Sequence, residues 1–357
     1  MSNLFDSGLS RYGWTAALDH AFTEHHKAGL MPARIVRVNR GLCDAVTESG
    51  PTRARIAAAY SPDPLQAPCT GDWAALRPGP DPELVALLPR SSAIVRSSAS
   101  RSSHGQVLAA NIDIVAVVVS LAVALDAARL ERLLALAWDS GARPLIVLTK
   151  ADLAPDPAAA HAEAAALAPG VDVLVTSVTT GQNLDVLTAL LSGSTTVLLG
   201  SSGAGKSSLG NALLGDELLA TSEVRAQDGK GRHTTVRREL VPLPGGGVLI
   251  DTPGLRGIGL YDTTDGLEHV FAEIEDLARD CRFGDCAHHT EPGCAVLAAI
   301  EAGELTERRL NSYRKLQREN AWAASRKDAR LRAERSNRQK AITSQLRATY
   351  KFRNRKS

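Results

Sequence analysis

Long apolar runs are missing from this 357-residue sequence. A membrane-spanning helix needs about 20 consecutive apolar residues, yet even residues 112–128, the most apolar stretch, contain Asp113 and Asp126. The first six residues also lack the positively charged and then apolar pattern of a secretory signal. We therefore expect a protein of the cytoplasm with no membrane partner.

Cysteine is scarce and unevenly placed. There are five cysteines, an odd number, and three of them lie between residues 281 and 294. Such bunching excludes a disulfide framework. We expect Cys43 and Cys69 to be small core residues of a reduced protein.

Net charge is small, at +2, but it is concentrated at one end. Residues 326–357 form a basic C-terminal tail with twelve Lys and Arg against Asp328 and Glu334, a local charge of +10 that leaves −8 for residues 1–325. Such a tail suggests a polyanion such as RNA as partner, and a solvated segment that keeps the protein soluble is the alternative. Nothing such as a heptad repeat indicates an oligomer, so we expect a monomer.

The chain length and the changes in residue pattern along the sequence predict several domains. Residues 1–32 are expected to form a peripheral N-terminal extension. Short alternating segments within residues 33–97, the last of them at 94–96, predict an all-β barrel of the OB-fold type. Its arginines either bind an oligonucleotide or protect sheet edges; they are Arg34, Arg37, Arg40, Arg53 and Arg55.

A polar stretch at residues 97–106 is expected to be a linker. Beyond it, apolar strands alternate with amphipathic helices through residues 107–262, which predicts a doubly wound parallel α/β sheet. The expected helices are 127–140, 157–167 and 184–191.

A phosphate-binding loop follows the apolar strand that begins at Val197. Glycines at this position let successive N–H groups point at a polyphosphate, while Lys206 neutralises its oxygens and Ser207 offers a hydroxyl to Mg²⁺. We expect nucleotide contacts along the whole loop, from Gly200, Ser201, Ser202, Gly203, Ala204, Gly205, Lys206, Ser207 and Ser208.

The base-reading candidates precede this loop in the chain. Asp152, in the motif Thr149-Lys150-Ala151-Asp152, can accept two hydrogen bonds from guanine, and adenine offers no matching pair of donors. Lys150 would lay its aliphatic stem over the ring. Ser177 ends the next strand, at the second guanine-contacting loop. A metabolic P-loop kinase would have no guanine loop.

Two switch candidates follow the phosphate loop. Residues 231–235 contain His233, Thr234 and Thr235, and either threonine could bind Mg²⁺. Asp251 and Gly254 would serve the Mg²⁺ shell and the γ-phosphate. Leucine follows Gly254, where many GTPases have a water-orienting Gln, so His233 is the candidate for that role, with docking on RNA or on the zinc domain as the alternative. The catalytic candidates are therefore His233, Lys206, Thr234 and Thr235.

Base-reading loops that precede the phosphate loop and switches predict a circularly permuted P-loop GTPase. The region after the second switch, residues 263–325, is expected to be a mainly helical zinc-binding domain. Cys281, Cys286, His288 and Cys294 supply three thiolates and one imidazole, the ligands of a closed, structural Zn²⁺ site. His289 is the rival nitrogen ligand.

These motifs, in this order and with this Cys/His spacing, resemble the ribosome small subunit-dependent GTPase A family, RsgA or YjeQ. The resemblance covers roughly residues 33–320. It implies an OB-fold domain, a permuted G domain and a zinc domain, with GTP hydrolysis stimulated by the small (30S) ribosomal subunit late in its maturation and 16S rRNA as the contacted polyanion. An RNA-binding protein with a weak or regulatory GTPase not tied to the ribosome is the alternative.

One departure from the family lies in the base-reading loop. Thr149 stands where the family usually carries Asn, which removes an amide that braces the loop and touches the base. Asp152 preserves guanine discrimination, so we expect lower affinity more than altered specificity.

Overall fold

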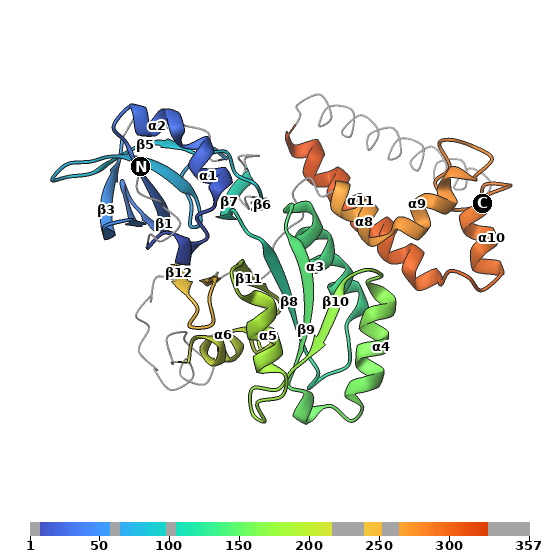
Figure 1. The fold of residues 1–357 in the computed structure, drawn as a ribbon. Coiled ribbons are helices and arrows are strands. Elements are labelled where there is room, and N and C mark those ends of the chain that lie inside the picture. The colour runs from blue at the N-terminus through green and yellow to red at the C-terminus, as the bar shows by residue number, and fades with distance from the viewer. Residues whose placement is uncertain (1–7, 58–64, 98–104, 216–238, 252–263, 328–357) are drawn as a thin grey trace, which may run out of the picture.

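The computed structural model describes residues 8–57, 65–97, 105–215, 239–251 and 264–327. Three parts follow one another along the chain: a β-barrel, an α/β sheet and a group of C-terminal helices (Figure 1). The α/β sheet connects the other two parts, with the barrel on one side and the C-terminal helices on the other (Figure 1).

The barrel is closed by five strands, which confirms the predicted OB-type architecture. Alternation places small apolar side chains such as Ile35, Cys43 and Ala54 inside, where they are fully buried. The strands are β1 (Met31–Asn39), β2 (Leu42–Thr47), β3 (Gly50–Ile56), β4 (Trp73–Arg77) and β5 (Glu83–Leu87), in the order β1-β2-β3-β5-β4. Antiparallel pairing of β4 with β1 closes the barrel.

The strand expected at 94–96 does not close the barrel. It is β6 (Ala93–Ser97), which pairs with β7 (Gly105–Ala110) in a separate two-stranded sheet. Ile94 and Leu108 are buried in the core of the α/β part, which explains why this pair leaves the barrel. The polar stretch expected as a linker therefore connects two paired strands, and residues 98–104 within it lie outside the described structure.

The N-terminal segment, predicted as a peripheral extension, is packed on the outside of the barrel. It contains η2 (Ser10–Tyr12), α1 (Ala16–Ala21) and α2 (Thr23–Lys27). Trp14 and Phe22 are buried, and the Trp14 ring meets that of Trp73 edge-on at 4.9 Å. Aromatic surface of this size is stabilising only when it is removed from water.

The central sheet has six strands in the order β10-β9-β8-β11-β13-β12, and every pair except β12 with β13 is parallel. The predicted doubly wound fold is confirmed. The strands are β8 (Ile114–Ser120), β9 (Arg143–Thr149), β10 (Asp172–Val175), β11 (Thr195–Leu199), β12 (Glu239–Pro242) and β13 (Val248–Asp251). The carboxyl ends of the parallel strands meet at one edge, where ligands bind in such sheets.

Helices cover both faces of the sheet. Val115 and Val117 point to the face covered by α3 (Ala127–Asp139) and α4 (Pro157–Leu167), whereas Ile114 and Ala116 point to the opposite face. The helices α5 (Leu184–Leu191) and α6 (Lys206–Leu214) cover that second face (Figure 1).

Two of the C-terminal helices, α8 (Thr264–Val270) and α11 (Glu307–Lys327), pack against α3. The other two are α9 (Ala272–Arg279) and α10 (Ala295–Glu301). A Cβ on Gly266 of α8 would lie 2.1 Å from the Ala135 carbonyl oxygen, so only glycine permits this helix crossing. Glu131 of α3 is fully buried and accepts hydrogen bonds from Arg308, Arg309 and Ser312 of α11.

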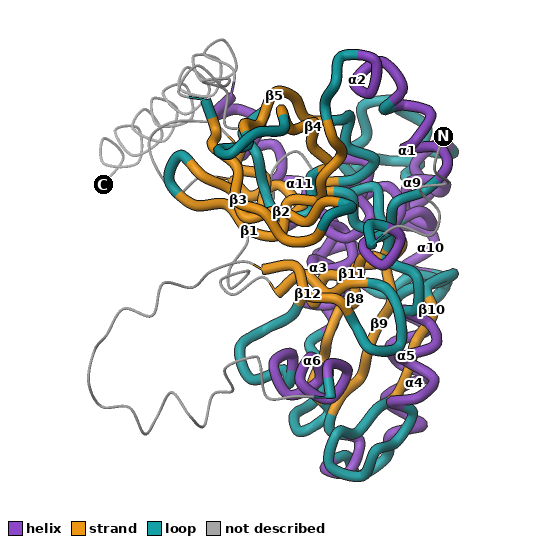
Figure 2. Tube along the Cα trace, turned by 60° about the vertical axis from the view of Figure 1, so that its left-hand side comes forward, coloured by secondary structure: helices purple, strands orange, loops and turns teal. Residues whose placement is uncertain are grey.

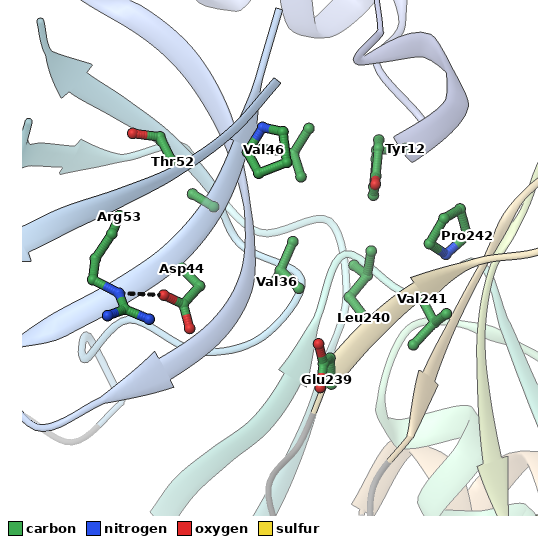
Figure 3. A pocket seen from close by; sticks show the side chains of 12 residues that line it. Tyr12, Val36, Asp44, Val46, Thr52, Arg53, Glu239, Leu240, Val241 and Pro242 are labelled. Atoms are coloured by element: carbon green, nitrogen blue, oxygen red, sulfur yellow. Dashed lines mark hydrogen bonds and ion pairs between the residues drawn. The ribbon is translucent and has the colours of Figure 1, made fainter. Parts of the chain in front are cut away.

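The barrel meets the sheet on the side of β12 (Figure 2). Arg34 is buried at the joint, where its guanidinium lies 4.4 Å from the Trp73 ring centroid and donates to Thr195 Oγ1 at 3.2 Å. A groove of about 570 Å³ between the barrel and β12 is lined by residues such as Tyr12, Val46 and Leu240 (Figure 3). None of the predicted nucleotide-site or metal-ligand residues lines this groove.

Candidate functional site

The phosphate loop connects β11 to α6 at the carboxyl edge of the sheet. Gly203 and Gly205 have left-handed backbones, with φ of 79° and 92°. A Cβ at Gly200 would lie 2.3 Å from the Val118 carbonyl oxygen, so that position also requires glycine. The loop then enters the nine-residue helix α6, whose amino-terminal N–H groups favour an anion.

The ammonium of Lys206 lies across this loop. Its Nζ donates to the carbonyl oxygens of Gly200 at 2.8 Å and Ser201 at 2.6 Å. Ala204 is buried beneath the turn, while Ser202, Gly203 and Ser208 are exposed. The structure thus gathers the nine predicted residues, from Gly200 to Ser208, into one turn with a cation at its centre.

The base-reading loop is hydrogen-bonded to the phosphate loop. Thr149, at the end of β9, donates from Oγ1 to the carbonyl oxygen of Ala204 at 2.6 Å. Lys150 has a left-handed φ of 58°, and its Nζ donates to the carbonyl oxygen of Gly203 at 2.9 Å. Two adjacent side chains therefore fix the distance between a base site and a phosphate site.

Asp152 and Ser177 come together from neighbouring strands. Asp152 lies in the short 3₁₀ turn η3 (Ala151–Leu153) after β9, and Ser177 follows β10. The buried Ser177 hydroxyl donates to Asp152 Oδ1 at 2.5 Å and accepts from the backbone N–H of Thr180 at 3.2 Å. These bonds orient the carboxylate that we expect to read guanine.

The switch candidates fall largely outside the described residues. His233, Thr234 and Thr235 lie in the undescribed segment 216–238, and Gly254 lies in 252–263. The backbone of Asp251 ends β13, which runs parallel to β11 with Ile250 opposite Val197. This register brings the end of β13 beside the strand that enters the phosphate loop.

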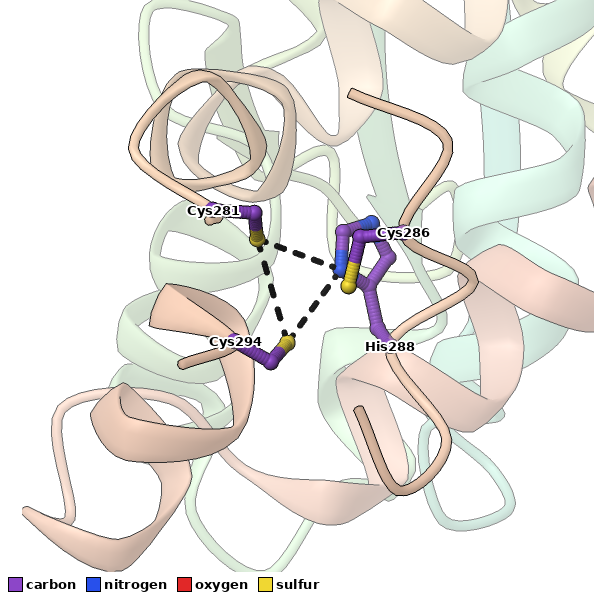
Figure 4. Close-up of side chains that lie close together, drawn as sticks. All are labelled: Cys281, Cys286, His288 and Cys294. Carbon is purple, nitrogen blue, oxygen red and sulfur yellow. Dashed lines mark hydrogen bonds between the residues drawn. The ribbon is translucent and has the colours of Figure 1, made fainter. Parts of the chain in front are cut away.

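The four predicted metal ligands form one cluster, with all ligand atoms within 4.8 Å of one another (Figure 4). Cys281 Sγ lies 3.8 Å from Cys294 Sγ, and His288 Nδ1 lies 3.4 Å from Cys294 Sγ and 3.6 Å from Cys281 Sγ. A tetrahedral zinc ion with Zn–S of about 2.3 Å and Zn–N of about 2.0 Å separates its ligands by about 3.5 to 3.8 Å. The cluster contains His288 and not the rival His289.

The electrostatics of the cluster favour a bound cation. Burial raises the pKa of the Cys286 thiol to about 11, and hydrogen bonding with the Cys294 and Cys281 sulfurs, together with the charge of Cys294, acts in the same direction. Burial, together with the charge of Arg314, lowers the pKa of His288 and keeps its imidazole neutral, as a metal ligand must be. A divalent ion would remove the repulsion between the thiolates.

Sequence reasoning missed the side chains that support this cluster. Glu291 and Arg314 hydrogen-bond to the backbone around His288. Glu291 could have been found from the sequence, because it is an acidic residue within the Cys/His segment. Arg314 could not, because it lies on α11, 26 residues from the group that it contacts.

Comparison with known proteins identifies the family of this chain. The sequence model of the RsgA GTPase family matches residues 87–261. A Streptomyces coelicolor protein named small ribosomal subunit biogenesis GTPase RsgA is 58% identical over 332 residues, which cover 92% of this chain and 91% of that protein. A protein of the same name from Streptomyces avermitilis is 57% identical over 330 residues, covering 91% of this chain and 89% of that protein.

Solved structures show the same architecture. The crystal structure of YjeQ from Thermotoga maritima matches with a TM-score of 0.60 and 25% identity, covering 82% of this chain and 98% of that one. The structure of YloQ, a circularly permuted GTPase, matches with a TM-score of 0.58 and 25% identity, covering 83% and 96%. The barrel, the permuted sheet, the Cys/His cluster and these relatives agree, and the chain belongs to the RsgA GTPase family.

Proposed function

We propose that this chain hydrolyses GTP to GDP and phosphate as a late assembly factor of the small (30S) ribosomal subunit. GTP binding in this proposal rests on one observation. Thr149 and Lys150 hydrogen-bond the base-reading loop to the phosphate loop. The ribosomal part is supported by relatives whose name is small ribosomal subunit biogenesis GTPase.

Each nucleotide-site residue has a chemical role in this proposal. Asp152, oriented by Ser177, reads guanine, and the loop from Gly200 to Ser208 holds the phosphates. Ser207 binds Mg²⁺ directly, and Asp251 binds it through water. Thr234 or Thr235 completes the Mg²⁺ shell, and the Gly254 N–H meets the γ-phosphate.

Water activation is assigned to His233. The residue after Gly254 is a leucine, which has no polar group to orient water. An imidazole near neutral pH can accept a hydrogen bond from the attacking water. His233 is then held in position by the ribosomal partner, which makes the isolated enzyme slow.

Zinc is the metal that best fits the Cys281, Cys286, His288 and Cys294 cluster. Three soft thiolates and one imidazole at tetrahedral separations suit Zn²⁺ better than Mg²⁺ or Ca²⁺. Four protein ligands leave no open position, so the ion is structural.

The RNA contact of the barrel is limited to two of the five arginines considered as candidates. Arg34 is buried, and Arg37 and Arg53 are paired with Asp44. Arg40 and Arg55 are exposed and have no ion-pair partner among the described residues. We assign phosphate contacts on 16S rRNA to Arg40 and Arg55, and to the basic tail at 326–357.

Binding to purified ribosomal subunits tests the proposal. A monomeric cytoplasmic assembly switch should sediment with small subunits and not large ones, and more tightly with a non-hydrolysable GTP analogue than with GDP. The variant Lys206→Ala should lose this nucleotide dependence. Equal binding with the analogue, with GDP and without nucleotide would instead support an RNA-binding protein with a weak or regulatory GTPase not tied to the ribosome.

A further inference from the structure

The backbone around His288 is held by a carboxylate that is not one of the four clustered ligands. Glu291 Oε2 accepts from the N–H of His289 at 2.6 Å and of Thr290 at 3.0 Å, and Oε1 accepts from the N–H of Ala287 at 3.3 Å. Backbone N–H groups of residues on both sides of His288 are therefore held by one side chain. Hydrogen bonds to a charged acceptor are stronger than those between neutral groups.

A second charged side chain holds His288 itself. Arg314, on α11, donates from its guanidinium to the His288 carbonyl oxygen. The helix α11 is in turn fastened to α3 through Arg309 and the buried Glu131. The position of His288 is thus set by the helical scaffold as well as by its own loop.

His288 needs this support because its backbone is in the left-handed region. Its φ is 58°, a conformation that a non-glycine residue seldom adopts unless its surroundings impose it. In this conformation the ring places Nδ1 between the Cys281 and Cys294 sulfurs, at 3.6 Å and 3.4 Å. Without the supporting bonds, the loop would relax and carry the ring away from the thiols.

We propose that Glu291 and Arg314 are positioning residues that preorganise His288 as the nitrogen ligand and thereby set how tightly the metal is held. Neither residue binds the ion, so both act through the geometry of His288. This inference rests on the proposed metal site. Loss of partners that orient metal ligands typically weakens metal affinity about 10- to 100-fold.

The variant Glu291→Gln tests the inference in the full chain. Glutamine has nearly the same shape, but one oxygen is replaced by an NH₂ group that faces backbone N–H donors. We expect Zn²⁺ to pass from the variant to a colorimetric chelator about 10-fold faster than from the wild type. Substitution with Co²⁺ should also show an altered visible spectrum, because that spectrum reports the nitrogen ligand.

The matched control is Glu301→Gln, which makes the same charge change on α10. The Glu301 side chain is exposed and has no hydrogen-bond partner in the described part of the chain. Its Zn²⁺ release should equal that of the wild type. Wild-type release and an unaltered Co²⁺ spectrum in Glu291→Gln would overturn the inference while leaving the metal site intact.

A measurement on the wild type avoids dependence on the folding of a variant. Hydrogen exchange should show slow amides at Ala287, His289 and Thr290 even after Zn²⁺ is removed, since their acceptor is Glu291. Rapid exchange of these amides in the Zn²⁺-loaded protein would overturn the inference. A wild-type chain that binds neither Zn²⁺ nor Co²⁺ would overturn the metal site itself.

Discussion

A single hydroxyl connects the predicted base-reading loop to the predicted phosphate loop. Thr149 is buried and donates to the Ala204 carbonyl at 2.6 Å, and the Val119 carbonyl lies 3.2 Å from the same oxygen. One hydroxyl proton serves one acceptor well, so the shorter contact to the phosphate loop is the principal bond. Threonine therefore braces this loop, although the family's usual Asn would add a contact to the base.

Removing that hydroxyl should weaken nucleotide binding. Thr149→Val keeps the shape of the side chain but leaves the buried Ala204 carbonyl without its donor, which costs about 1–2 kcal/mol. We expect the Kd for a fluorescent GDP analogue to rise about tenfold. Thr47→Val, which removes a side-chain bond to the Gly50 carbonyl in the barrel, is the control and should bind normally. Equal affinity in both variants would contradict the bracing role.

The assigned role of His233 leads to a separate prediction. His233→Ala should retain wild-type affinity for GTP but lose the hydrolysis stimulated by small subunits, because the attacking water is no longer oriented. Stimulated single-turnover hydrolysis and equilibrium binding separate these two effects. Full stimulated activity in the variant would remove His233 from the mechanism.

Among the elements, α3 and α11 form the joint between the nucleotide-binding and metal-binding parts. Arg309 donates to Glu131 at 2.8 Å and to Glu273 at 2.6 Å, and it lies 4.4 Å from the Phe271 ring centroid. Both Glu131 and Arg309 are almost fully buried. A buried ion pair is sensitive to the loss of one partner, because the other charge then lacks compensation.

Two glutamates on these helices provide a matched test. Glu131→Gln should lower the free energy of unfolding by about 3 kcal/mol, since it leaves Arg308 and Arg309 facing a neutral amide. Glu319→Gln, which breaks a half-buried pair with Arg132 across the same helices, should cost less than about 1 kcal/mol. Urea unfolding followed by circular dichroism gives both values. Similar losses would show that burial does not distinguish the two pairs.

The predictability of the elements depended on the range of the interactions that stabilise them. The helices α4 and α5 begin and end at the predicted residues, since their signals are local: α4 has its Asp156 cap followed by Pro157, and α5 has its apolar spacing. The predictions missed the short strand β5 and the pairing of β6 with β7, because partners distant in sequence stabilise short strands.

The sites, like the elements, were predictable where their residues are close in sequence and not where their partners are distant. Glycine and lysine spacing predicted the tight turn from Gly200 to Ser208, and Cys/His spacing predicted the four-residue cluster, because each is built from one short segment. Burial of Glu131 depends on Arg309, 178 residues away, and no local pattern on α3 signals that partner. Packing of Trp14 on Trp73 was missed for the same reason.

Across the whole molecule, the metal-binding part follows directly in the chain after the predicted second switch. The helix α8 begins at Thr264 and is locked against α3 where Gly266 meets Ala135. The metal-binding part is therefore anchored to the same body that carries the nucleotide site, on the opposite side from the barrel (Figure 1). Such an arrangement presents two separate surfaces to one large partner.

Removal of the metal should distinguish the role of the Cys/His cluster in small-subunit binding from the role of the sheet in GTP hydrolysis. Chelation is expected to release the Cys281, Cys286 and Cys294 side chains from one another without disturbing the sheet, because α3 is held to the sheet by its own apolar core. Unstimulated GTP hydrolysis should then be unchanged, whereas affinity for small subunits should fall about tenfold. Sedimentation and phosphate release measured on one chelated sample would test this, and restoration by Zn²⁺ is the control. Loss of unstimulated activity would show that the metal supports the nucleotide site itself.

Steady-state GTP hydrolysis by the purified protein, alone and with purified small or large ribosomal subunits, tests the proposed function most directly. We predict slow hydrolysis by the isolated protein, stimulation of about tenfold or more by small subunits, and no stimulation by large subunits. Hydrolysis at the same rate under all three conditions would contradict a role as a GTPase of small-subunit assembly.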